Sequence, residues 1–208
     1  MDVRGVILRS DPGGPDCLLA GWARRRGIGL ATVATGEGAV LPALDGGHDF
    51  AVVFAEATPA LVAWLREADA AGTPLLGIAA GAHAVSSALG GATRRLDRPA
   101  IGWREVESAD PARVPQGPWL TWQEQAMTPP PLSYELAWNR DGTQAFCLRR
   151  HLAVQFHPEA TAQLLVAWAA ELEAAGLDAG ALSGRAPSVP AAERLFDGFA
   201  ARAGLALV

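Results

Sequence analysis

A histidine and a glutamate in the C-terminal half of the chain have the spacing of a proton-transfer pair. They are His157 and Glu159, which flank Pro158 at the end of an apolar, strand-like run. Residues i and i+2 of an extended segment project to the same side, so the carboxylate can orient the imidazole while the imidazole moves a proton. The alternative is that the pair only ends a strand, with Pro158 shaping the turn and no proton being transferred.

The segment Pro74–His83 has the composition of a nucleophile elbow. An apolar run through Ile78 is followed by the small residues Ala79–Gly81 and then by helical spacing up to Gly90-Gly91. So sharp a turn requires small residues beside its tip, and it places the tip side chain over the N-terminus of the next helix, which favours an anion. A thiolate would be stabilised there, but the residue at the tip is Ala79.

These residues resemble the class I glutamine amidotransferases, in particular stand-alone proteins similar to the glutaminase domain of GMP synthase. That family carries G-I-C-x-G-x-Q at the elbow, and Gly77, Ile78 and Gly81 match it. Ala79 stands where the family has its cysteine, and His83 stands where it has glutamine. The elbow is therefore expected to be present without its reactive atom.

The second signature of the family is complete. His157-Pro158-Glu159 matches the family's H-P-E, and the resemblance implies a general-base histidine with an orienting carboxylate. Further landmarks lie in the family's order across nearly the whole chain, at Gly90-Gly91, Ile101–Trp103, Gln144–Phe146 and Leu195–Phe199. Two places depart from the pattern: Ala55-Glu56 replaces a Gly-Gly turn that helps to form an oxyanion hole, and Trp122–Gln125 replaces a W-H-G-D-like segment.

The resemblance implies a reaction that this sequence cannot begin. In the family, a thiolate attacks the side-chain amide of glutamine, forms a glutamyl thioester and releases ammonia. Ala79 has no thiol, and deleting the nucleophile of such a unit typically removes about 10^6-fold in rate. We therefore expect negligible glutaminase activity, with no metal and no cofactor. The candidate ligand-binding residues in the same cleft are Ala80, His83, Glu56 and Gln123.

Other side chains near the elbow are weaker candidates for a nucleophile. Ser86 and Ser87 lie about 11 Å further along the predicted helix, so we expect them to pack or to cap. His83 follows Ala79 by about one turn, and a structural or ligand-contacting role is favoured over a catalytic one. Glu56 would repel a developing negative charge and prefer a cationic group, or it is only an exposed acid that interacts with a helix dipole.

The remaining cysteines and histidines show no metal-ligand spacing. Cys17 and Cys147 lie far apart in the sequence, and both are interpreted as small buried hydrophobic residues. His48 lies in a turn-rich loop and His151 in a predicted hairpin, and both are expected at the surface.

The elements around these residues alternate between strand and helix. Apolar runs predict strands at Val3–Leu8, Leu30–Val33, Phe50–Phe54 and Pro74–Ile78, the first ending at the turn cluster Asp11–Pro15. Helical spacing is found from Leu18 to Ala23, from Thr58-Pro59 to Gly72, through Val85 and Leu89, and from Leu164 to Leu172. The pattern predicts an α/β fold with a mostly parallel open sheet and helices on both faces, as in the flavodoxin-like class I glutamine amidotransferases.

Length and composition favour one domain over residues 1–208, because half of the 208 residues are hydrophobic and can form one substantial core. The formal net charge of -5 argues against an electrostatic nucleic-acid-binding protein. No apolar stretch is long enough to cross a membrane and no signal peptide is evident, so a cytoplasmic protein is expected.

Three functional hypotheses follow from this pattern. The first is a glutaminase-deficient, amidotransferase-like module that binds a small ligand in the elbow cleft, or a synthetase-like protein partner, in a biosynthetic assembly. The second is an enzyme of changed chemistry that uses His157 and Glu159 on an amine-containing metabolite. The third is a genuine glutamine amidotransferase whose cysteine has been changed to alanine at position 79, which would not account for Ala55-Glu56 or Gln123.

Overall fold

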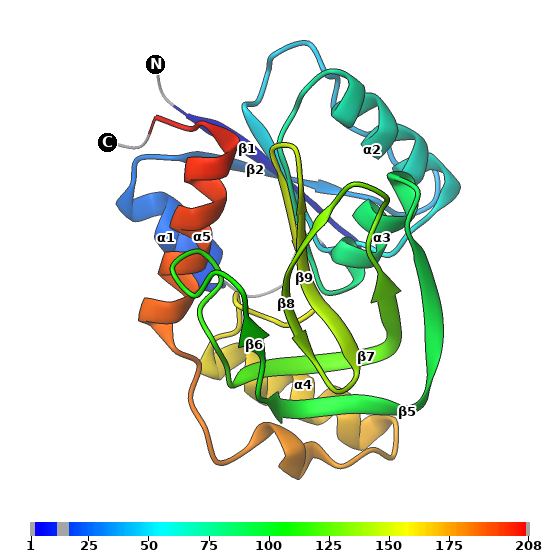
Figure 1. Cartoon of the computed structure of the whole chain (residues 1–208), viewed down its shortest axis with the longest axis vertical. Coiled ribbons are helices and arrows are strands. Elements are labelled where there is room, and N and C mark those ends of the chain that lie inside the picture. Colours follow the sequence, from blue (N-terminus) through cyan, green and yellow to red (C-terminus); the bar gives the residue numbers. More distant parts are fainter. Residues whose placement is uncertain (1–2, 12–16, 207–208) are drawn as a thin grey trace.

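The computed structural model describes residues 3–11 and 17–206, and this part of the chain contains one ten-stranded sheet (Figure 1). Its first half is a run of five parallel strands in the order β2-β1-β3-β4-β10. These strands are β1 (Arg4–Arg9), β2 (Gly29–Ala34), β3 (Phe50–Val53), β4 (Leu75–Ile78) and β10 (His151–Val154). The four strands predicted from apolar runs are confirmed, and so is the parallel arrangement.

The second half of the sheet is antiparallel and continues from β10 through β9, β7 and β5. These strands are β9 (Gly142–Leu148), β7 (Trp119–Thr128) and β5 (Ala92–Arg104). Two further strands lie beside this path, where β8 (Tyr134–Asn139) pairs with β9 and β6 (Glu107–Ser108) pairs with β8. Figure 1 shows β5 and β7 as a long, curved ribbon that leaves the parallel region and passes beneath it.

Helices cover both faces of the parallel region, as predicted. Helices α1 (Leu18–Arg25) and α5 (Val189–Ala203) cover one face, and α2 (Pro59–Ala70) and α3 (Ala80–Ala88) cover the other, whereas α4 (Ala162–Ala174) and the short 3-10 helix η1 (Ala179–Leu182) pack on the antiparallel half. The Thr58 hydroxyl accepts a hydrogen bond from the Leu61 amide at 3.2 Å, and Pro59 occupies the first turn, which confirms the predicted start of α2. No helix within the described residues is long and apolar enough to span a bilayer.

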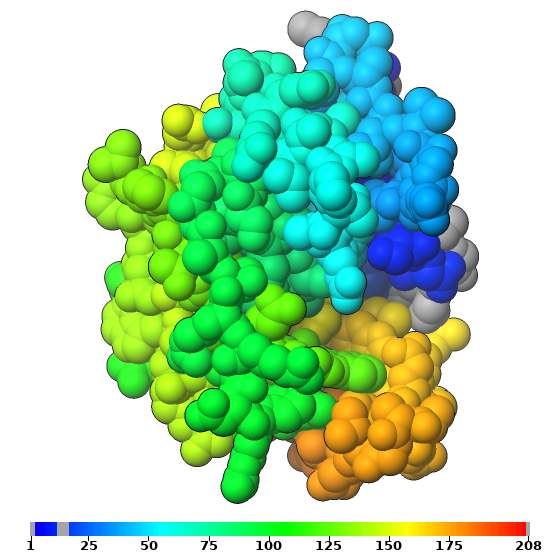
Figure 2. Space-filling view, turned by 90° about the vertical axis from the view of Figure 1, so that its right-hand side faces the viewer, coloured from blue at the N-terminus to red at the C-terminus, as the bar shows by residue number. Residues whose placement is uncertain are grey.

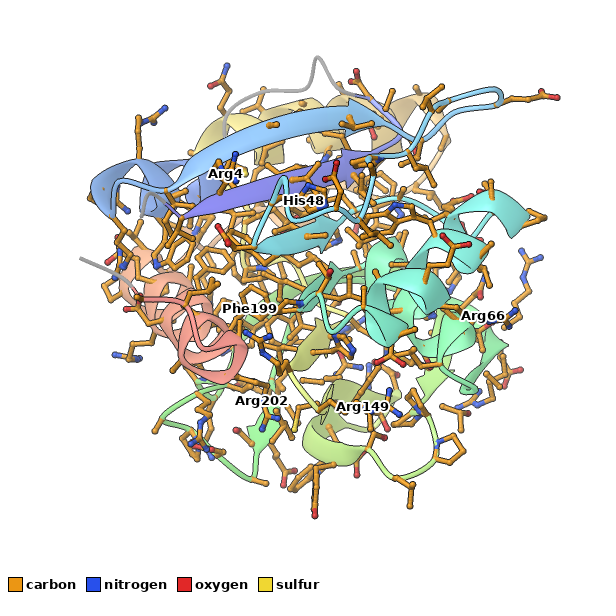
Figure 3. All side chains as sticks on the ribbon, turned by 90° about the horizontal axis from the view of Figure 1, so that it is seen from above. Arg4, His48, Arg66, Arg149, Phe199 and Arg202 are labelled. Carbon is orange, nitrogen blue, oxygen red and sulfur yellow. The ribbon has the colours of Figure 1, made fainter. Side chains whose placement is uncertain are left out.

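Alternation along the strands separates two hydrophobic cores. On β1, Ile7 belongs to the core beneath α1 and α5, whereas Val6 and Leu8 belong to the core beneath α2 and α3. Successive side chains of a strand point to opposite faces, so a strand buried on both sides must be apolar throughout. In the first core, Phe199 of α5 packs edge-to-face on Phe50 of β3, with ring centroids 5.8 Å apart (Figure 3).

A third, smaller core lies under α4 at the edge of the antiparallel half. It contains buried Leu120, Leu172 and Leu182, and the partly buried rings of Trp122 and Trp168 pack against it. This core joins α4 and η1 to β5 and β7, and it therefore places two tryptophans beside the segment that follows β10.

The prediction that His151 lies at the surface was wrong. His151 is 2% exposed, accepts a hydrogen bond from the Leu75 amide at its Nδ1 and lies 2.8 Å from the Asp69 carboxylate at its Nε2. His48, labelled in Figure 3, is half-buried. The predicted hairpin at His151 is confirmed, since β9 and β10 pair directly across it. Of the predicted turn Asp11–Pro15, only Asp11 lies within the described residues.

Candidate functional site

The turn between β4 and α3 has the geometry of an elbow. Ala79, at its tip, has φ 52° and ψ −115°, a backbone conformation that a residue with a side chain rarely adopts. Its amide donates to the carbonyl of Val154 on β10 at 2.9 Å, which holds the turn against the neighbouring strand. A Cβ atom on Gly81 would lie 1.7 Å from the carbonyl oxygen of Val53, so only glycine fits there.

His157 and Glu159 form the pair that their spacing predicts. His157 Nδ1 lies 2.8 Å from Glu159 Oε1, and the glutamate is 5% exposed. The His157 ring also packs against the ring of Trp168 with centroids 4.8 Å apart. A proton on Nδ1, shared with the carboxylate, leaves Nε2 of the neutral ring as an acceptor. This Nε2 is buried and has no hydrogen-bond partner among the described residues.

The pair faces a cavity of about 340 Å³, which we call the apolar chamber. Its walls include Phe54, Leu164, Trp122 and Trp168, together with His157 and Glu159. Figure 2 shows a hollow in the surface between the cyan and green segments and the orange segment that includes the end of α4. Arg9 and Glu171 also line it, so a ligand in this chamber would contact aromatic rings, one imidazole and charged side chains.

A second cavity, of about 400 Å³, lies on the other side of the elbow, and we call it the polar chamber. Its walls include Glu56, His83, Thr93, Gln123, Glu124 and Gln155. Ala79, Ala80 and Trp122 line both chambers, so the two meet at the tip of the elbow. The candidate residues taken from the sequence are thus brought together, but they divide between two spaces.

Two glutamines in the polar chamber are buried, and some of their side-chain amide atoms lack hydrogen-bond partners among the described residues. Gln123 is 5% exposed, and neither its Oε1 nor its Nε2 has a hydrogen-bond partner among the described residues. Gln155 is fully buried and donates from Nε2 to the Thr143 carbonyl, while its Oε1 has no partner. Buried side-chain amides normally have hydrogen-bond partners, so these glutamines are unusual.

Burial lowers the pKa of His83, and the neighbouring Gln155 amide opposes that shift, so His83 is neutral at pH 7.

Neither Ser86 nor Ser87 lies at the tip of the elbow, which Ala79 occupies. Ser86 is fully buried and donates its hydroxyl to the Thr128 carbonyl at 2.8 Å, which confirms the predicted packing role. Ser87 lies instead on the wall of the polar chamber.

Three residues of the cleft carried no functional role in the sequence interpretation. Trp168 lies within the helix predicted from Leu164 to Leu172, and the sequence assigned it no further role. Cys17 was interpreted as a small buried residue, but it is half-buried and lines the apolar chamber, whereas Cys147 is buried as expected. Gln155 interrupts the apolar run that leads to His157, and a polar residue inside a buried run was the available signal for it.

No protein-family model matches the sequence, and the search of curated proteins found no significant match. Solved structures do match over almost the entire chain. A glutamine amidotransferase of Thermotoga maritima is 18% identical with a TM-score of 0.84, covering 99% of this chain and 100% of that one. A glutamine amido transferase of Methylobacillus flagellatus is 17% identical with a TM-score of 0.83, covering 97% and 95%. A protein of Thermoplasma acidophilum, described as a candidate GMP synthase subunit, is 15% identical with a TM-score of 0.67, covering 98% and 95%. The chain therefore has the fold of the class I glutamine amidotransferases, which confirms the predicted fold class.

Proposed function

We propose that this chain is a glutaminase-deficient protein of the amidotransferase fold that binds a small ligand, a protein partner or both in the elbow cleft. The observation that carries the proposal is Ala79, a methyl group held at the tip of a strained elbow beside an intact His157–Glu159 pair. A thioester requires sulfur at this position, and the pair has no nucleophile to activate. We treat residues 1–208 as one domain and place the protein in the cytoplasm.

The other thiol in the cleft does not take over the reaction. Cys17 lines the apolar chamber, but burial raises the pKa of its thiol, and the Glu159 carboxylate raises it further. A thiolate is the reactive form of cysteine, so a raised pKa leaves Cys17 as a weakly nucleophilic thiol at neutral pH.

Residues on the other side of the elbow also differ from the family's pattern. These differences support a loss of glutaminase function over the alternative that only position 79 has been changed. Glu56 places a carboxylate in the polar chamber, at the loop where the resemblance leads us to expect a glycine pair and an oxyanion-binding amide. His83 and Gln123 line the same chamber at two further positions that differ from the family's pattern. Three separate segments have therefore changed around one cavity.

A protein partner is the second part of the proposal. One structural neighbour is described as a candidate GMP synthase subunit, and the word subunit implies a protein partner for that neighbour. By analogy with the fold, we propose that a synthetase-like protein is the partner of this chain, and that the pathway is biosynthetic.

A changed enzymatic activity is the alternative supported by a specific observation. His157 has its Nδ1 held by Glu159 and its Nε2 free of protein partners among the described residues, which is the arrangement of a general base facing a substrate. Substituting His157→Ala should abolish turnover by such an enzyme but leave the partner binding of a pure scaffold unchanged.

The central test is ammonia release from L-glutamine by the purified chain. We expect no release above the enzyme-free blank, because removing the nucleophile costs about 10^6-fold in such a unit. The matched variant is Ala79→Cys, which restores the sulfur; we expect it to remain far below an active glutaminase because the loop at Glu56 has changed. Steady ammonia release by the wild-type chain, or immediate full activity in the variant, would contradict the proposal.

A further inference from the structure

The polar chamber is rich in hydrogen-bond acceptors and lacks fixed positive charge. Glu56 and Glu124 contribute carboxylates, and the described residues that line it include neither arginine nor lysine. Arg95 of β5 lies 3.8 Å from the Glu124 carboxylate and offsets part of its negative charge. The negative charge of Glu56 is not offset by this arginine. His83 adds an imidazole whose Nδ1 is buried without a partner among the described residues.

The buried glutamines give the chamber a preference for donors. The Gln155 amide is oriented by its own donation to Thr143, so its Oε1 is left as an acceptor. Gln123 lies on β7, opposite Ala100 of β5, and within the described part of the chain neither its Oε1 nor its Nε2 has a hydrogen-bond partner. A buried carbonyl oxygen without a donor destabilises the ligand-free protein. A ligand that donates several hydrogen bonds would remove that destabilisation.

The two chambers adjoin at the tip of the elbow, where the thiol that the resemblance leads us to expect is absent. Ala79 lines both of them, and its methyl group stands where the family resemblance places a larger sulfur-bearing side chain. Trp122, which also lines both, offers an aromatic surface along the same path. A ligand can therefore extend from the acceptor-rich side to the apolar side past the tip of the elbow.

We propose that the polar chamber binds the ammonium or guanidinium group of a small ligand whose apolar part lies in the apolar chamber. Glu56 supplies the opposite charge, and Gln123 and Gln155 accept hydrogen bonds from the cationic head. The rings of Trp122 and Trp168 hold the apolar part. The inference rests on the proposed binding function, because a working glutaminase would place glutamine in the same cleft.

The test uses four probes that share a phenyl tail: 2-phenylethylammonium, 2-phenylethylguanidinium, the neutral 2-phenylethanol and the anion phenylacetate. Binding to the full chain is measured by titration calorimetry. We expect at least one of the cations to bind roughly fivefold more tightly than the alcohol, which corresponds to about 1 kcal/mol for a partly exposed ion pair. We expect phenylacetate to bind most weakly.

Two variants identify the chamber. Glu56→Gln should reduce the affinity for the cations roughly fivefold and leave the affinity for the alcohol unchanged. Glu67→Gln is the matched control, because it removes the same charge from an exposed position of α2 away from the chamber, and it should change neither affinity. Equal losses in both variants would assign the effect to net charge and overturn the proposal.

Gln123→Met provides a readout that a purely structural role would not show. It should weaken cation binding and raise the melting temperature of the ligand-free chain, because it removes two buried amide atoms that lack partners among the described residues. A lower melting temperature with unchanged binding would contradict a ligand-facing glutamine.

The outcomes separate the two proposals. Binding of the alcohol without preference for either cation, tighter binding of phenylacetate, or no binding of either cation would overturn the cationic subsite while the binding module stands. Ammonia release from glutamine would overturn the proposed function itself.

Discussion

At the scale of single residues, Ala79 is held in a backbone conformation that favours glycine. The strain is maintained by neighbours on both sides, since its amide is bonded to Val154 and Gly81 lies against the Val53 carbonyl. The surrounding packing therefore preserves the elbow although no nucleophile occupies its tip. The same packing keeps the His157–Glu159 pair beside a methyl group.

Ala79→Gly should stabilise the chain by about 1 kcal/mol. Relief of the strained φ contributes roughly 1–3 kcal/mol, and the greater freedom of glycine in the unfolded chain removes roughly 0.4–1 kcal/mol of that. The melting temperature reports the difference. Ala80→Gly is the control, because Ala80 is helical and glycine there should destabilise the chain by up to about 1 kcal/mol. A lower stability in both variants would show that Ala79 is not strained.

At the scale of elements, the contact between α3 and β3 decides where the elbow lies. Gly81 allows the first turn of α3 to approach the carbonyl end of β3, and Gly77 allows β4 to approach the same turn. This contact places the tip of the elbow between the apolar and polar chambers. A larger residue at either position would move the helix away from the sheet.

Gly81→Ala should destabilise the chain by about 3 kcal/mol, because the added Cβ would overlap the Val53 carbonyl oxygen. Helix propensity alone would favour alanine by about 1 kcal/mol, so the sign distinguishes the two effects. Gly21→Ala in α1 is the control, since its Cβ would meet only the flexible end of Arg25 at 3.3 Å. Denaturant unfolding should show a loss for the first variant and none for the second.

At the scale of the whole molecule, a buried histidine joins three elements. His151 of β10 accepts from the Leu75 amide of β4 and contacts the Asp69 carboxylate of α2. The hydrogen bond from the Leu75 amide requires an unprotonated Nδ1. The neutral ring therefore carries its proton on Nε2 and donates a hydrogen bond from there to Asp69. Burial lowers the pKa of His151 below 6.5, although Asp69 opposes the shift. Protonating the ring would break the bond from Leu75.

The stability of the fold should therefore decrease as the solution becomes acidic. A histidine with a lowered pKa stabilises the folded state fully above its unfolded value of about 6.5 and loses that contribution as the pH falls through it. Asp69, whose pKa is also lowered with help from His151 and Arg149, adds a further loss below about 4. The melting temperature measured between about pH 8 and pH 5 should fall with pH.

His151→Gln should reduce this pH dependence without removing it, because burial also lowers the pKa of His83. The variant is compared with wild type at about pH 8, where both histidines are neutral, so that its lost packing is measured separately. An unchanged slope in the variant would show that His151 does not control the acid response.

The local features of this chain could be predicted from the sequence. The β4–α3 elbow, the start of α2 at Thr58 and the His157–Glu159 pair each depend on residues within a few positions of one another. Their apolar periodicity, capping residue and i, i+2 spacing therefore lie in one short stretch. The resemblance extended these local predictions to the fold class, but it offered no role for Gln155 or Cys17.

Only the tertiary structure decided which distant residues meet. The polar chamber joins Glu56, His83, Gln123 and Gln155 from four separate segments, and the burial of His151 depends on Asp69, 82 residues away. The sequence alone determined a sharp elbow without a nucleophile and a neighbouring histidine–glutamate pair, because short-range sterics and side-chain periodicity act along the chain. The two chambers follow from long-range pairing of β5, β7 and β10, which no local pattern contains.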